Sequence, residues 1–242
     1  MSNNLSAGKA NRDPGRSSQL LRAGIRLAVF ALFMAAVLFI SAGRLNWVMA
    51  WLYIGLYLVC SAVGLLVILS RHPDLMDERT EAPKDAKSWD RVLSTVCIVL
   101  TLLVPLPLAG LDARFGWSPQ LPLGIQLAAL VVWALATGLG IWAGASNKFY
   151  SRVVRIQKER GHVVVSDGPY QYVRHPGYAG AMLNTFALPL ILGSLWTLIP
   201  AGIAACLLIV RTVLEDRTLQ EELDGYKEYA GRVRYRLLPG VW

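Results

Sequence analysis

Charged residues are scarce in this sequence, and their scarcity sets the class of protein. Only 17% of the 242 residues are charged, whereas 55% are hydrophobic, and the mean hydropathy is +0.44. The few charges cluster between long apolar runs instead of being spread along the chain. This pattern excludes an ordinary water-soluble domain and predicts an integral, multi-pass membrane protein.

Acidic residues are scarcer than basic ones, at 16 against 24, which gives a formal net charge of +8. Such an excess can indicate nucleic-acid binding. Here, however, Lys and Arg fall in the linkers between apolar runs, where orientation in the bilayer already accounts for them. We therefore expect contact with membrane lipids and none with nucleic acid.

Cysteine and histidine are rare, with three of each. Cys60, Cys97 and Cys206 lie in separate apolar runs, and neither Cys-x-x-Cys nor His-x-x-x-His occurs. The sequence therefore predicts buried, inert thiols and no metal site. It also lacks a Gly-x-Ser-x-Gly elbow and a phosphate-binding Gly-Lys-Ser/Thr loop, so it does not fit those serine hydrolases or nucleotide-binding proteins.

Four apolar runs are each long enough to cross about 30 Å of hydrocarbon at about 1.5 Å per residue. They cover residues 27–43, 47–70, 92–111 and 121–145. Pro105 and Pro107 are expected to kink or end the third run. Before the first span, residues 1–22 are polar and lack apolar periodicity, so we predict a mobile tail there, followed by four transmembrane helices within residues 23–145.

A further uncharged stretch, residues 177–210, is too short for two full crossings. As continuous helix it would measure about 51 Å, whereas two crossings need about 60 Å. Pro189, Gly193 and Pro200 interrupt it, so we predict a tight helical hairpin whose tip stops short of the far surface. The predicted fold is thus an all-α integral membrane protein with about four transmembrane helices plus a C-terminal hairpin.

Basic residues alternate from one linker to the next, which predicts the orientation. The N-terminal tail and residues 71–91, 146–176 and 211–242 each contain several Lys and Arg residues, whereas the intervening loops contain only Arg44 and Arg114. By the positive-inside rule, both termini face the cytoplasm. The two polar segments that flank the hairpin then lie on the same side and can form one cytoplasmic pocket.

The densest polar and aromatic run is Asp-Gly-Pro-Tyr-Gln-Tyr-Val-Arg-His-Pro-Gly-Tyr, residues 167–178. Its Gly-Pro and His-Pro steps prevent a continuous helix, so Tyr170, Arg174, His175 and Tyr178 are expected on irregular backbone beside the hydrophobic block. Acidic and basic residues follow the hairpin. Such a set suits a ligand that is partly charged and partly flat.

These residues resemble the isoprenylcysteine carboxyl methyltransferase family, whose wider group includes phospholipid N-methyltransferases. The resemblance covers residues 147–242. Its motifs are Asn147 with Phe149, Val-Arg-Ile-Gln ending at Gln157, Gly161-His162, Gly168-Pro169-Tyr170, Arg174-His175-Pro176-Gly177-Tyr178 and Glu215-Asp216. It implies that residues 146–242 form the catalytic region, with a cofactor-binding loop, the hairpin and a C-terminal helix.

The cofactor that this resemblance implies is S-adenosyl-L-methionine. The residues it implies around the cofactor are Gln157, His162, Val164, Gly168, Tyr170, Arg174, His175, Tyr178 and Glu215. Arg174 or His175 could meet the cofactor carboxylate, and Glu215 the ribose or ammonium group. Members that methylate carboxylates hold the substrate with an Arg, so Arg211 and Arg236 are both candidates for that role, and Arg211, Glu215 and Arg236 are the predicted catalytic residues.

By resemblance, the methyl acceptor is a lipophilic carboxylate of the isoprenylcysteine type, while a small thiol or a lipid amine stays open. A second hypothesis is an NADPH-dependent membrane enzyme of the sterol-reductase type, which also has a His-Pro-x-Tyr element. Those reductases carry His-Pro-Asn-Tyr followed by Gly-Asp, whereas this chain has His-Pro-Gly-Tyr-Ala-Gly-Ala. A third hypothesis, a scaffold or transporter, would favour charges within the spans or an internal repeat.

Overall fold

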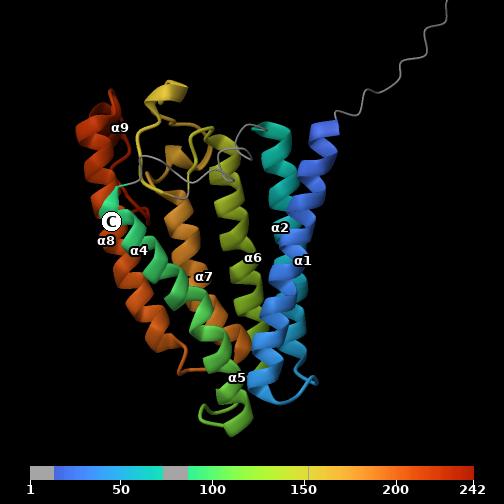
Figure 1. Cartoon of the computed structure of the whole chain (residues 1–242). Coiled ribbons are helices and arrows are strands. Elements are labelled where there is room, and N and C mark those ends of the chain that lie inside the picture. Colours follow the sequence, from blue (N-terminus) through green and yellow to red (C-terminus); the bar gives the residue numbers. More distant parts are fainter. Residues whose placement is uncertain (1–13, 73–86, 152) are drawn as a thin grey trace, which may run out of the picture.

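The computed structural model describes residues 14–72, 87–151 and 153–242, and every regular element in these ranges is helical (Figure 1). The longer helices are α1 (Pro14–Ala42), α2 (Val48–Arg71), α4 (Ser88–Ile98), α5 (Pro105–Phe115), α6 (Leu123–Ser146), α7 (Pro176–Leu192) and α8 (Leu198–Glu222). Shorter elements are the π-helical η1 (Val99–Leu103), the 3₁₀ turns η2 (Lys158–Arg160) and η3 (Gly168–Gln171), and α9 (Tyr226–Arg232). The all-α prediction is confirmed for the described residues.

Within the described residues, five helical segments are long and apolar enough to cross a membrane. They are Leu20–Ala42, Val48–Arg71, Ser88–Phe115, Leu123–Ser146 and Leu198–Glu222. Many of their large apolar side chains face outward, among them Ile40 and Leu135 with exposed fractions of 76% and 70%. These surfaces are suited to lipid, and the prediction of an integral membrane protein is confirmed.

Several boundaries differ from those expected. Residues 14–22, assigned to the tail, belong to α1, because Pro14 can occupy the first turn of a helix and the following residues continue it. The predicted tail otherwise lies outside the described residues, as does most of the 71–91 linker. The third span begins at Ser88, four residues earlier than predicted, and is interrupted by η1 and by Pro105 at the start of α5.

The residues of the predicted hairpin form α7, a turn and α8. α7 has 17 residues and α8 has 25, and Gly193 ends α7 with a φ of +71°. α8 continues to Glu222, so the acidic pair Glu215-Asp216 lies on the same helix as the apolar segment. The count of four spans plus a hairpin stays a prediction.

One cysteine contradicts the expectation of buried thiols. Cys97 is buried and Cys60 is half-buried, but Cys206 is exposed. It lies on α8, where Ile203, Ile209 and Val210 are also exposed. This face of α8 points outward, away from the helical bundle.

At one end of the bundle, the buried carboxylate of Asp112 on α5 joins two turns. Its Oδ2 accepts hydrogen bonds from the hydroxyls of Ser118 and Ser194, each at 2.5 Å, and its Oδ1 accepts one from the Ser118 amide at 2.7 Å. Ser118 precedes α6 and Ser194 precedes α8. This cluster therefore fixes the α7–α8 turn against the α5–α6 loop.

Candidate active site

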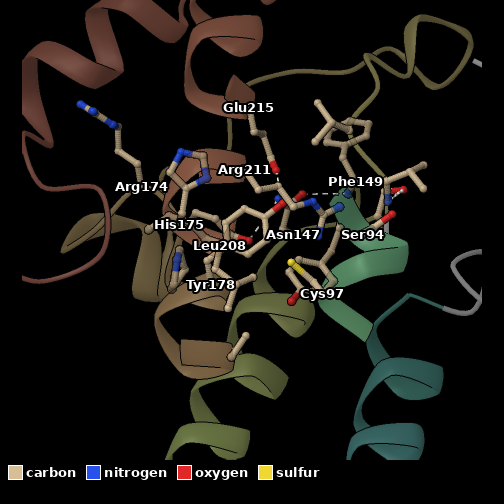
Figure 2. A pocket seen from close by; sticks show the side chains of 18 of the residues that line it. Ser94, Cys97, Asn147, Phe149, Arg174, His175, Tyr178, Leu208, Arg211 and Glu215 are labelled. Carbon is tan, nitrogen blue, oxygen red and sulfur yellow. Dashed lines mark hydrogen bonds between the residues drawn. The ribbon is translucent and has the colours of Figure 1, made fainter. Parts of the chain in front are cut away.

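At the opposite end of the bundle, a cavity of about 680 Å³ extends from the 147–178 segment down between the helices. One part is polar and is lined by His162, Arg174, His175, Tyr178, Arg211 and Glu215. The other is mainly apolar, with Phe30, Leu102, Trp133, Leu188 and Leu208 in its wall. Figure 2 shows Tyr178, Arg211 and Glu215 converging in this cavity.

Most of the residues predicted from the sequence line this cavity. They are His162, Val164, Tyr170, Arg174, His175, Tyr178, Arg211 and Glu215. Gln157, Gly168 and Arg236 are not among its lining residues. Gln157 instead braces the loop, since its side chain donates to the Phe149 carbonyl at 2.8 Å and accepts from Arg160 at 2.6 Å. Gly168, with a φ of +60°, begins η3 just before Tyr170.

Asp216 is the centre of a buried charge cluster beside the cavity, and it is only 1% exposed. Arg174 Nη2 and Arg236 Nε donate to its Oδ2, each at 3.0 Å. His175 Nε2 lies 3.2 Å from Oδ1, and the Tyr226 hydroxyl donates to the same oxygen at 3.1 Å. One carboxylate thus faces two guanidinium groups and an imidazole, which leaves this cluster net positive.

The Arg-His-Pro motif is held by the C-terminal segment as well as by α8. The amides of Arg174 and His175 donate to the carbonyls of Tyr235 and Arg236, both at 2.9 Å. Arg174 Nη1 also donates to the Ala230 carbonyl at the end of α9, at 3.2 Å. His175 directly precedes Pro176, the first residue of α7. These bonds therefore fix the position of the first turn of α7, which lines the cavity.

A second cluster lies directly on the cavity and links α4, α7 and α8. The Tyr178 hydroxyl donates to Glu215 Oε2, and the Arg211 guanidinium lies 5.2 Å from the centre of the Tyr178 ring. Arg211 Nε donates to Asp90 Oδ1 at 2.6 Å, and the Val154 amide donates to Asp90 Oδ2 at 2.8 Å. Asp90 is fully buried, so it fixes Arg211 from behind.

Asp90 was not predicted as a functional residue, because it falls within the charged 71–91 linker of the sequence. The signal was its place in the sequence, immediately before a long apolar run that otherwise has no acidic residue until Asp112. Burying a carboxylate at the end of a membrane helix is costly unless a cation pairs with it. Here that cation is Arg211, which also lines the cavity and is therefore a candidate functional residue.

Tyrosines and an aromatic pair complete the polar part of the cavity. Tyr170 accepts a hydrogen bond from the Asn147 amide at 3.3 Å, and its carbonyl accepts one from the Tyr229 hydroxyl at 2.7 Å. Burial raises the pKa of the Tyr170 and Tyr229 hydroxyls, so both stay neutral hydrogen-bonding groups. The rings of Phe149 and His162 lie 4.4 Å apart, centroid to centroid. This part of the cavity thus combines charge with flat aromatic surface.

Two comparisons with known proteins both find similarity to isoprenylcysteine methyltransferases. The model of the isoprenylcysteine carboxyl methyltransferase (ICMT) family matches residues 125–221, which hold nearly all of α6, the 147–175 segment, α7 and nearly all of α8. A Dictyostelium discoideum protein named protein-S-isoprenylcysteine O-methyltransferase is 25% identical over 169 residues, covering 60% of this chain and 71% of that protein. Both similarities confirm the predicted resemblance to the ICMT family, and with it the prediction that this chain is a membrane methyltransferase.

Proposed function

We propose that this protein transfers a methyl group from S-adenosylmethionine to the carboxylate of a lipophilic acceptor of the isoprenylcysteine type. The observation that carries the proposal is a single cavity whose polar part contains Arg211 and Glu215 and whose remaining part is apolar and lies between membrane helices. A polar cofactor and a lipophilic acceptor can meet in such a space. The volume of about 680 Å³ lies within the range of small-molecule sites, roughly 300–1,000 Å³.

The donor set fits S-adenosylmethionine, which carries a carboxylate, an ammonium group, a sulfonium, a ribose and an adenine. The net positive cluster of Arg174, His175 and Arg236 around Asp216 would favour the carboxylate. Glu215 would hold the ammonium or the ribose, and the rings of Tyr170 and Tyr178 would pack on the flat or cationic parts. When bound, the cofactor supplies an electrophilic methyl group.

Of the two arginines open from the sequence, we assign Arg211 to the acceptor carboxylate. Arg211 lines the cavity beside Tyr178, whereas Arg236 bonds to Asp216 outside it. Asp90 holds Arg211 through Nε at 2.6 Å and Nη2 at 3.2 Å, which fixes the plane of the guanidinium. A carboxylate is already anionic, so alignment of the acceptor, rather than proton removal, is what these residues contribute.

The acceptor enters from the bilayer in this proposal. Ile98 at the end of α4 lines the cavity and is also 55% exposed, so the wall of the cavity is thin at this point and borders the surface of the bundle. An apolar chain is more stable in lipid than in water, whereas the cofactor comes from the aqueous side. Residues 146–242 form the catalytic region in this account, with Asp90, Tyr53 and Phe30 contributed from the preceding helices.

The site and both termini face the cytoplasm in this proposal. Basic residues concentrate at that end of the helices, and the opposite loops contain only Arg44 and Arg114. The cytoplasm also supplies S-adenosylmethionine, so the orientation and the choice of cofactor are consistent.

Titration calorimetry of the detergent-purified protein tests the choice of cofactor. S-adenosylhomocysteine should bind with a micromolar Kd, NADPH should not bind, and Glu215→Gln should weaken S-adenosylhomocysteine at least tenfold because it removes the carboxylate in the cavity. Glu221→Gln is the matched control, since Glu221 lies on the same helix but is solvent-exposed and paired with Arg217. Binding of NADPH alone would replace this proposal with the reductase hypothesis.

A further inference from the structure

The apolar part of the cavity is a slot along one side of α7. Tyr178, Ala181, Thr185 and Leu188 line it at intervals of three or four residues, as expected for one face of a helix. Leu188 follows Tyr178 by ten residues, which is about 15 Å along the helix axis. The slot is therefore much shorter than the hydrocarbon thickness of about 30 Å and ends inside the bundle.

A second wall of the slot is formed by α4 and η1. Ser94, Ile98, Thr101 and Leu102 line the cavity from this segment. Leu106, about one turn beyond Leu102, is not among the lining residues and has no exposed surface. The slot thus ends at Leu102 on this wall, as it ends at Leu188 on α7.

Aromatic side chains close the inner end of the slot. Trp133 on α6 lines the cavity and belongs to the same buried cluster as Leu188 and Tyr53. The rings of Tyr53 and Trp133 lie 5.5 Å apart, centroid to centroid, with an interplanar angle of 82°. Phe30 and Tyr57, whose ring centroids are 5.4 Å apart, also line the cavity. Edge-to-face and tilted contacts between rings are favourable, so Trp133 and Leu188 form a well-packed floor.

Beyond this floor the bundle is filled by side chains. Met34, Leu38 and Ile191 have no exposed surface, belong to the same cluster as Trp133 and are not among the residues that line the cavity. Protein interiors are packed as densely as organic crystals, so an acceptor chain cannot pass between these side chains. The depth of the slot therefore limits the length of a chain that lies in it.

We propose that Trp133 and Leu188 limit the isoprenyl chain of the acceptor to about two isoprene units. The inference rests on the proposed function, in which Arg211, 5.2 Å from the centre of the Tyr178 ring, holds the carboxylate at the top of the slot. About 15 Å accommodates about 12 bonds of an extended chain, at roughly 1.25 Å per bond. The cysteine part takes up about a third of this length, and the remainder matches a geranyl chain rather than a farnesyl or geranylgeranyl chain.

Binding of N-acetyl-S-geranylcysteine and N-acetyl-S-farnesylcysteine to the detergent-purified protein tests this limit. Both compounds are titrated without cofactor, so the result does not depend on methyl transfer. A longer chain also partitions more strongly into detergent, but this contribution is the same for every variant. The quantity to compare is therefore the ratio of the farnesyl Kd to the geranyl Kd, because between variants this ratio changes only through the protein.

Trp133→Leu and Leu188→Ala each deepen the slot and should lower this ratio at least about fourfold, the gain from burying one further CH₂ group. Leu135→Ala, on α6 but 70% exposed, is the control and should leave the ratio unchanged. Binding of S-adenosylhomocysteine identifies the variants that are folded. An unchanged ratio in both folded variants would show that the chain leaves the slot sideways and would overturn the length limit alone. If neither compound binds while S-adenosylhomocysteine does, the isoprenyl acceptor is contradicted and the limit with it.

Discussion

Two buried aspartates have different structural roles in this site. Asp216 gathers Arg174, His175 and Arg236 beside the cavity, whereas Asp90 holds Arg211 on the cavity wall. Each carboxylate is at most 1% exposed, so each depends on its cationic partners to be stable in the ionised form. The first cluster braces the Arg-His-Pro motif, and the second orients the side chain that we assign to the acceptor.

Asp90→Asn should impair acceptor binding without affecting the cofactor. The amide keeps the shape of the side chain but loses the charge that orients the Arg211 guanidinium, and a small displacement of a binding group can reduce kcat/KM by about 10- to 100-fold. We expect the acceptor KM to rise while the Kd of S-adenosylhomocysteine stays within about twofold. Asp224→Asn, at an exposed position before α9, is the control. A variant that lost cofactor and acceptor binding equally would contradict a positioning role.

Asp216→Asn should act mainly on stability. It leaves the buried Arg174 guanidinium and the partly exposed Arg236 guanidinium without their carboxylate, and removing one partner of a buried ion pair costs about 3–5 kcal/mol. Thermal unfolding in detergent should therefore show a clear fall in Tm, whereas Glu221→Gln, which breaks an exposed pair on the same helix, should change it little. An unchanged Tm for Asp216→Asn would mean that the cluster is not a structural centre.

Between elements, the contact of α6 with α7 is the one that shapes the cavity. These two helices carry Trp133, Thr137, Tyr178 and Asn184, and their separation is set by Gly180 against the Ala136 carbonyl. Small residues allow such close approach in membranes, where packing rather than water drives helix association. The shape of this part of the cavity therefore depends on one glycine.

Gly180→Ala should destabilise the protein by about 1–3 kcal/mol, because the added Cβ would force α6 and α7 apart. Gly202→Ala on α8 is a matched control, since a Cβ there meets nothing within 4 Å. That change should be neutral or stabilise α8 by up to about 1 kcal/mol. Measured in the same detergent, the Tm of Gly180→Ala should fall below that of Gly202→Ala. Equal Tm values would contradict the packing role of Gly180.

For the whole molecule, much of the architecture could be predicted from the sequence because the helices must match the thickness of a membrane. Hydrocarbon thickness fixes the length of a span, so apolar runs indicated the helices that the structure shows, although α1 and α4 begin earlier than the apolar runs do. The Arg174-His175-Pro176 motif likewise indicated the cavity. Contacts between distant segments were not predictable: Asp90 and Arg211 are 121 residues apart, and no local pattern pairs them.

The same limit applies to the choice between Arg211 and Arg236. Both follow the last apolar run, and only the packing of the C-terminal segment against Arg174 and His175 separates the one on the cavity from the one beside Asp216.

The proposed orientation can be measured with single cysteines in a variant that lacks the three natural ones. A membrane-impermeant maleimide should label Gln120→Cys, in the exposed loop before α6, in intact cells. It should label Glu228→Cys, on the exposed face of α9, only after permeabilisation. The reverse pattern would place the site on the outer side and contradict the positive-inside assignment.

The most direct test of methyl transfer to a carboxylate is to incubate membranes containing the protein with S-adenosylmethionine labelled with tritium in its methyl group. Methyl esters release methanol in alkali, whereas methyl thioethers and methylamines do not. We expect label in the lipid-extractable fraction that alkali releases as volatile methanol and that falls at least tenfold in Arg211→Gln. Label that is stable to alkali would contradict a carboxylate acceptor, and no incorporation above membranes without the protein would contradict the proposed transfer itself.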